Sequence, residues 1–339
     1  MSYKEIFVIY ETNEKKTINI FGKNFVENNK ENVQLIIDKK EINLTDVYEI
    51  EGKKEITLKI LKDLTDLSFM FNECENLVNI NGLQFLNTKE VTSLKCLFSG
   101  CKSLEDIDAL KTWDVSKVTL FNHMLFNCEK LKDIKPLEKW NVSSGINFTC
   151  FLRNTNISDI SPLREWNVSK GENFRGMFCS CSILENINPL TKWDVSNGEI
   201  FESMFAYCPK LSDISPLAKW KVCKGKVFSG MFNNCKLLSN ITVLGKWDVS
   251  NGEKFRKMFY NTAISDIEPI RDWKMSHAED LSGMFSKTKI SCLAPILNWK
   301  IEQVEYFTQL FDESSPDELE ILNKAEESEG TLEIKTNIL

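Results

Sequence analysis

Residues 113–134 read WDVSKVTLFNHMLFNCEKLKDI, and residues 140–160 read WNVSSGINFTCFLRNTNISDI. Both stretches begin with tryptophan, continue through Phe-x-x-x-Leu and end with Asp-Ile. Self-similarity at a fixed period of this length is typical of a solenoid, in which each repeat packs only on its neighbours. All the tryptophans of the chain follow this register, 26 or 27 residues apart: Trp113, Trp140, Trp166, Trp193, Trp220, Trp247, Trp273 and Trp299.

Other apolar positions keep the same register. Phe or Leu lies twelve residues after each tryptophan and again four residues before that point, and Met is common between them. This i, i+3, i+4 spacing, as in Phe121–Leu125, predicts a short helical turn that packs inward. The segment that follows, as in Leu131–Leu137 (LKDIKPL), predicts a short parallel strand that ends at the proline, because proline cannot donate to a ladder.

The repeats have two lengths. Long repeats carry Cys-x-x-Leu, as in Cys208–Leu211, whereas short repeats carry Thr-x-Ile, as in Thr262–Ile264. A turn absorbs a change of length more easily than a packed strand does, so the sequence predicts a turn here. We interpret the recurring cysteine as a small side chain that fills this turn, rather than as part of a metal or redox site.

The pattern predicts a repeat solenoid of mixed helix and strand, with about ten turns of 26 or 27 residues. Residues 1–58 alternate apolar and polar side chains and predict a β-rich N-terminal cap. A separate ubiquitin-like or other binding module is the alternative for this region. Residues 59–311 form the predicted solenoid, and residues 312–339 predict a C-terminal cap made of a helix and a short strand.

Composition limits the function classes. The net charge of -7 argues against a nucleic-acid or anionic-membrane binder, and no apolar run reaches the roughly 20 residues of a membrane span. An odd count of 11 cysteines, without a signal-peptide pattern, predicts reduced thiols and a cytoplasmic location. With only two histidines and no Gly-rich phosphate loop, we expect no enzyme activity and no cofactor.

Two polar columns form the candidate site. The residue before the expected strand isoleucine is Asp or Asn in eight consecutive turns: Asn79, Asp106, Asp133, Asp159, Asn186, Asp213, Asn240 and Asp266. The column two residues later includes Asp108, Lys135 and Glu268, and the two columns together hold seven acids and one lysine. Such a surface predicts a protein partner with a basic segment, with divalent cations as the weaker alternative and nucleic acid excluded. Alternatively, the side chains bond local backbone and align because every turn is alike.

The motif W-D-V-S-x-V/G-x-x-F-x-x-M-F-x-x-C-x-x-L-x-x-I resembles the BspA-like leucine-rich-repeat family, in the branch built of 26-residue surface-protein repeats, over roughly residues 60–311. The resemblance implies a right-handed solenoid used for protein binding, often in surface adhesion, with the two polar columns on its concave face. Because the sequence lacks an anchor pattern, the first hypothesis is an intracellular scaffold or adaptor. A cell-surface adhesin and a structural component of a larger assembly, such as a cytoskeletal array, are the alternatives.

Overall fold

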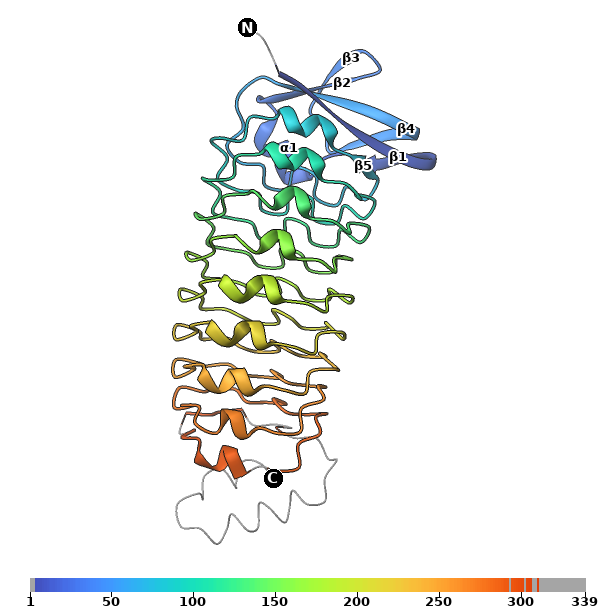
Figure 1. Cartoon of the computed structure of the whole chain (residues 1–339). Helices are drawn as coiled ribbons and strands as arrows, with labels where there is room; N and C mark the ends of the chain where they lie inside the picture. Colours follow the sequence, from blue (N-terminus) through green and yellow to red (C-terminus); the bar gives the residue numbers. More distant parts are fainter. Residues whose placement is uncertain (1–3, 293, 302, 307–309, 311–339) are drawn as a thin grey trace. The chain divides into compact units, whose positions relative to one another are not determined.

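A computed structural model describes residues 4–292, 294–301, 303–306 and 310. The chain divides into two compact units, Met1–Val168 and Ser169–Leu339. The first unit contains an antiparallel sheet followed by repeats, and the second contains further repeats of the same kind (Figure 1). None of the helices in the described ranges has the length and apolar character needed to cross a bilayer. The predicted C-terminal cap at 312–339 lies outside the described residues.

The N-terminal cap is a five-stranded antiparallel sheet in the order β3-β2-β4-β1-β5. Alternate apolar side chains face the core, so that Ile6, Val8 and Tyr10 are all buried. The predicted β-rich cap is therefore confirmed. Its elements are β1 (Lys4–Asn19), α1 (Lys23–Asn29), β2 (Val33–Ile37), β3 (Lys40–Asn43), β4 (Val47–Ile60) and β5 (Leu77–Asn79).

Strand β5 belongs to the first repeat and joins the cap to it. It pairs antiparallel with β1, with Leu77 opposite Tyr10. Gly82 follows directly, and a Cβ at this position would collide with the backbone carbonyl oxygen of Phe7. Only glycine allows the two backbones to approach this closely. The sheet and the first repeat therefore pack as one continuous body.

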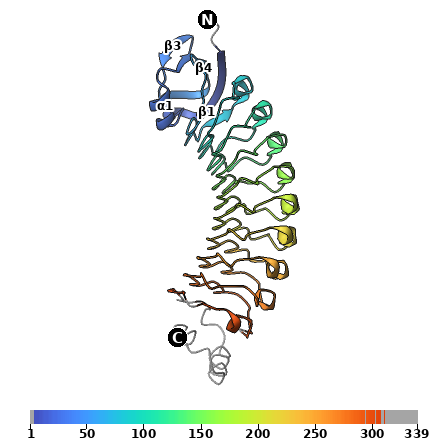
Figure 2. The same ribbon diagram turned by 90° about the vertical axis from the view of Figure 1, so that its left-hand side faces the viewer.

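Each described repeat contains one short 3-10 helix, and within each unit these helices stack in a row along one side of the repeats (Figures 1 and 2). They are η1 (Asn81–Phe85), η2 (Asp108–Thr112), η3 (Lys135–Leu137), η4 (Ser161–Leu163), η5 (Asn188–Lys192), η6 (Ser215–Lys219), η7 (Thr242–Lys246), η8 (Glu268–Ile270) and η9 (Ala294–Asn298).

These helices correct the strand predicted for Leu-x-x-Ile-x-Pro-Leu. Residues Leu131–Ile134 have no regular structure, and Pro136 lies at the start of helix η3 instead of ending a strand. Proline suits the first turn of a helix because the N–H that it lacks has no intrahelical partner there and its fixed φ is already helical. Among the residues that the structure describes, the predicted strand is present only in the first repeat, as β5, because β1 offers it a partner.

The prediction of a helical turn in the Phe-x-x-Met-Phe segment was also wrong, because the segment forms two tight turns. Phe228–Met231 and Phe232–Cys235 are two successive tight turns, each closed by a bond from the fourth N–H to the first carbonyl, at 3.1 and 3.0 Å. Their third residues, Gly230 and Asn234, both have φ of +62°. Such left-handed residues occur in type II turns and cannot continue a right-handed helix. Paired tight turns produce the same apolar spacing as a helix, so the spacing alone could not separate them.

Successive turns are held together through this segment. The N–H groups of Phe201, Ser203, Phe205 and Tyr207 donate to carbonyls of the next turn at distances of 2.7–3.0 Å. Isolated parallel bridges, such as Val227 with Lys254, run through the same stretch. The parallel pairing that the sequence predicts therefore exists, but it lies in the Phe-Met-Phe segment.

Stacked aromatic rings fill the core. Consecutive turns of unit 2 stack Phe201 on Phe228 with ring centroids 5.6 Å apart, and Trp220 on Trp247 with centroids 6.5 Å apart. The Trp220 Nε1–H also donates to the carbonyl of Leu190 in the preceding turn at 3.1 Å. Burial of aromatic side chains of this size dominates the stability of such a core. The solenoid-like repeat with ladders of like side chains is confirmed.

Candidate functional site

The Asp/Asn column lies at the entrance to the 3-10 helices. In each of its eight residues the side-chain Oδ1 accepts the backbone N–H of the residue two positions later, at 2.7–2.9 Å. This Asx turn directs the chain into the helix and fixes the side chain against its own backbone. The members are Asn79, Asp106, Asp133 and Asp159 in unit 1, and Asn186, Asp213, Asn240 and Asp266 in unit 2.

The structure brings these residues together within each unit, because the helices that they precede are stacked (Figure 1). All of them are exposed except Asn79, which is half-buried. Asp and Asn can replace one another because each offers the same Oδ1 acceptor. The local-backbone interpretation therefore describes the geometry of the column. It makes no use of the carboxylate charge, and partner binding stays a prediction.

The aspartates differ in how their second oxygen is used. The Oδ2 atoms of Asp159 and Asp213 accept bonds from serine hydroxyls two residues later, at 2.8 and 3.0 Å. Among the described residues, Asp106, Asp133 and Asp266 use only Oδ1 in hydrogen bonds. Their Oδ2 atoms are held in a fixed position by the Asx turn and are exposed to solvent.

The second column occupies the first residue of the helices. Asp108, Lys135 and Glu268 are exposed, and their backbone N–H groups are the donors of the Asx turns. The Glu268 Oε2 lies 2.8 Å from the Arg271 Nη2, one helical turn away. This exposed pair reduces the negative charge at the end of the column and contributes little to stability.

The sequence pattern did not predict a further column of Asx turns. Asp114, Asp194 and Asp248, directly after tryptophans, accept the N–H of the serine two residues later at 3.0–3.1 Å. The serine hydroxyl, and then its N–H, lower the pKa of each carboxyl. The Asp-x-Ser pattern within Trp-Asp-Val-Ser was the available signal. Asx turns are thus a general device of this chain, not a property of the candidate column alone.

The cysteine column is buried. The Sγ atoms of Cys101, Cys128, Cys208 and Cys235 lie 3.1–3.2 Å from carbonyl oxygens of the preceding turn, to which they donate. Burial raises the pKa of these thiols, that of Cys235 to about 12. A protonated thiol is a poor metal ligand and nucleophile. In the described ranges, no three His, Cys, Asp or Glu residues are arranged to hold a metal ion.

Two polar depressions lie on other surfaces. One, of about 430 Å³, lies in unit 1 between α1, which contributes Glu27, and the ladder segments that contain Phe69 and Lys95. The other, of about 310 Å³, lies in unit 2 and is lined by residues including Lys226 and His277. Neither is lined by a residue of the two predicted columns.

Three overlapping segments, residues 65–186, 149–269 and 226–323, match the model of a family described as "Mycoplasma protein of unknown function, DUF285". Together they span residues 65–323 of the 339. The chain belongs to this DUF285 family. No curated protein and no solved structure matches it.

The DUF285 match begins after strands β1–β4 and includes both candidate columns in full. The family is therefore one of repeats, and its overlapping matches follow from their self-similarity. The description of the family names no activity. The function of this DUF285 chain has to be argued from its exposed columns.

Proposed function

We propose that this protein is a non-catalytic scaffold or adaptor that binds a basic segment of a protein partner through the Asp/Asn column. The observation that supports the proposal is the set of exposed carboxylates, each fixed by an Asx turn and repeated on successive turns of a unit. Because these side chains are already ordered, they lose less conformational entropy when a partner binds. Carboxylates about 5 Å apart also repel one another, which a bound lysine or arginine would relieve.

The experiment compares two triple variants. Asp106→Asn, Asp133→Asn and Asp159→Asn remove three charges from the column but keep every Oδ1 acceptor, as Asn186 and Asn240 already do. The matched control is Asp114→Asn, Asp194→Asn and Asp248→Asn, which removes three charges from the other Asx column with the same conservation of bonding.

Both variants and the parent are used for affinity capture from cell extract and for titration with a defined oligolysine peptide, at low and raised salt. We expect the column variant to weaken binding by about tenfold, from three ion pairs of modest strength, with an unchanged melting temperature. Raised salt should release the partner. Equal binding by all three proteins would refute the proposal, and so would equal weakening by both triples.

The repeat motif supports a finer assignment. We propose that the solenoid is of the right-handed leucine-rich-repeat type, as the resemblance to BspA-like repeats implies. The same resemblance favours surface adhesion as the second candidate function. Accessibility of the chain to protease added to intact cells distinguishes the two: cleavage supports an adhesin, and protection supports the intracellular scaffold.

A further inference from the structure

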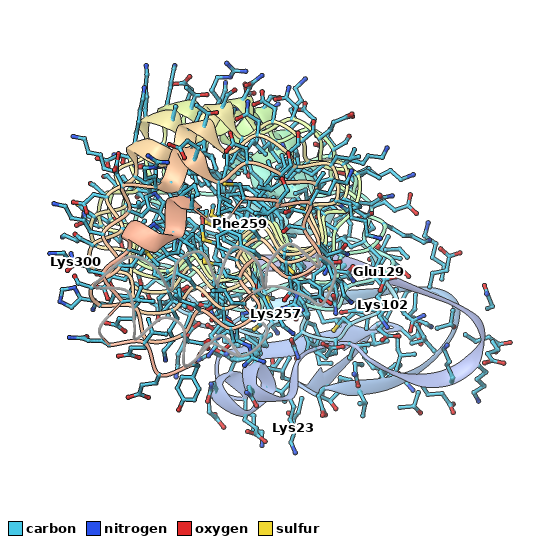
Figure 3. All side chains as sticks on the ribbon, turned by 90° about the horizontal axis from the view of Figure 1, so that it is seen from below. Lys23, Lys102, Glu129, Lys257, Phe259 and Lys300 are labelled. Carbon is cyan, nitrogen blue, oxygen red and sulfur yellow. The ribbon has the colours of Figure 1, made fainter. Side chains whose placement is uncertain are left out.

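The spacing of successive turns differs between the two sides of each unit. Stacked rings keep nearly the same orientation from turn to turn, so the distance between equivalent ring centroids measures the local spacing. In the phenylalanine columns of the ladder segments this distance is 5.3 Å for Phe121 and Phe148 in unit 1, and 5.7 Å for Phe259 and Phe285 in unit 2. Figure 3 labels Phe259, which is fully buried.

The tryptophan columns are spaced more widely. The ring centroids of Trp140 and Trp166 in unit 1 lie 6.5 Å apart, and so do those of Trp220 and Trp247 in unit 2. The last described pair of the column is 6.2 Å apart. The turns of each unit are therefore closest where backbone hydrogen bonds join the ladder segments, and they separate toward the tryptophans.

The Asp/Asn column lies on the widely spaced side. Asp213 is followed by the N-cap residue of helix η6, and Trp220 is the C-cap of the same helix, so the column and the tryptophans lie at the two ends of one row of helices. Figure 2 shows this row, within each unit, on the side opposite the ladder segments. Successive members of the column thus take the wider spacing, and their Asx turns hold them in place.

This spacing matches that of an extended polypeptide chain. A strand rises by roughly 3.2–3.4 Å per residue, so its alternate side chains point to one side about 6.4–6.8 Å apart. Each step along the column fits a strand to within about 0.6 Å. Successive turns of an α-helix are about 5.4 Å apart, so a helix falls short by about 1 Å at each step and is out of register by the third carboxylate.

We infer that the partner segment is an extended strand with lysine or arginine at every second residue, lying along the stacked turns of unit 1. Only in unit 1 does the column carry acids on three consecutive turns, Asp106, Asp133 and Asp159, because Asn186 and Asn240 separate the acids of unit 2. The inference rests on the proposed function and names the conformation and the charge pattern of its partner.

Two single variants of equal net charge provide the test. Asp133→Asn leaves Asp106 and Asp159, which are two turns apart, whereas Asp159→Asn leaves Asp106 and Asp133 on adjacent turns. Asparagine keeps the Oδ1 acceptor of the Asx turn, as Asn186 does. The melting temperature of each variant is compared with that of the parent.

The probes are two dye-labelled threonine peptides that each contain two ornithines, either two or four residues apart. Threonine favours the extended conformation. The ammonium group of ornithine lies closer to the backbone than that of lysine, which limits how far the side chain can compensate a misfit. Anisotropy titrations at low salt measure the affinity of both peptides for each full-length variant.

We expect the preferred peptide to change with the variant. Asp159→Asn should favour cations two residues apart, and Asp133→Asn should favour cations four residues apart, in each case by about threefold, because the other peptide loses one exposed ion pair. Net charge cannot produce this reversal, since it is the same in both variants.

The same order of affinities in both variants would overturn the inference. Weaker binding of both peptides by the triple variant Asp106→Asn, Asp133→Asn and Asp159→Asn would then leave the proposed function standing without it. A triple variant that binds both peptides as the parent does would overturn both. Tighter binding of an alanine-based helical peptide of equal charge to the parent would also overturn the inference, because the column would then fit a helix.

Discussion

Long and short repeats fill the same turn with different side chains that bond in different directions. In a long repeat the Cys208 Sγ donates to the carbonyl of Phe178, in the preceding turn, at 3.2 Å. In a short repeat the Thr262 Oγ1 donates to the carbonyl of Phe259, three residues back in its own turn, at 2.9 Å. Both side chains are buried. The cysteine therefore connects two turns, whereas the threonine closes one.

Two of the short repeats, those of Thr262 and Thr288, regain this connection through the backbone. Directly after the threonine, the N–H of Ala263 donates to the carbonyl of Leu238 in the preceding turn at 2.9 Å. In the next short repeat the N–H of Lys289 bonds the carbonyl of Ile264 at 2.8 Å. Deletion of one residue thus replaces a side-chain contact between turns by a backbone contact.

The largest expected effect concerns the buried tryptophan, which long and short repeats share. The Trp247 Nε1 donates to Leu217 and the Trp273 Nε1 donates to Leu244, at 3.2 and 2.9 Å, although only Trp273 follows a short turn. We expect Trp247→Ala and Trp273→Ala each to lower the free energy of unfolding by about 3–5 kcal/mol, since each leaves a large cavity. Urea unfolding measures both. Clearly unequal losses of stability would show that the length of the turn affects the packing of the tryptophan that follows it.

An intermediate effect tests the exchange of bonds itself. Thr262→Cys alone should cost about 1–2 kcal/mol, because it removes the bond to Phe259 while the short backbone keeps the thiol from the preceding turn. Adding one residue after position 262 should recover part of this loss by recreating the long turn. A double-mutant cycle on unfolding free energies measures the coupling. Strict additivity of substitution and insertion would refute the link between residue type and length.

The sequence predicted the columns more reliably than the local backbone. The period, the buried Trp, Phe and Cys positions and the turn at the length change all follow from residue type and spacing. The positions of helix and strand could not be predicted in this way. Two tight turns bury the same residues of the Phe-Met-Phe segment as one helical turn would. The overlooked signal for tight turns was the recurrence of Gly and Asn in this segment, since both residues favour positive φ. The residues with positive φ include Gly176, Gly230, Gly283, Asn127 and Asn234.

For the candidate site, the sequence supplied the residues and both interpretations of them. The eight Asx turns could have been anticipated, because Asp and Asn often bond the N–H two residues later. The pattern could not predict whether the second carboxylate oxygen, Oδ2, accepts a hydrogen bond. In two turns of the column it does, from the hydroxyl groups of Ser161 and Ser215.

The smallest expected effect concerns the Asx turns directly after the tryptophans, a segment in which long and short repeats do not differ. The pKa values of Asp114, Asp194 and Asp248 are lowered in the folded chain, first by the serine hydroxyl and then by its N–H. A carboxyl whose folded pKa lies below its unfolded value stabilises the fold above that unfolded value, near 3.9, and this contribution is lost as the pH falls through the folded pKa. We therefore expect stability to fall as the pH drops from about 5 toward 3, and Asp114→Asn, Asp194→Asn and Asp248→Asn together to flatten that part of the curve. Asparagine keeps the Oδ1 acceptor but not the charge, so the triple variant should lose near pH 7 the same contribution that the parent loses in acid. Urea midpoints at a series of pH values provide the measurement, and a curve equally steep with and without the three substitutions would place the acid-sensitive groups elsewhere.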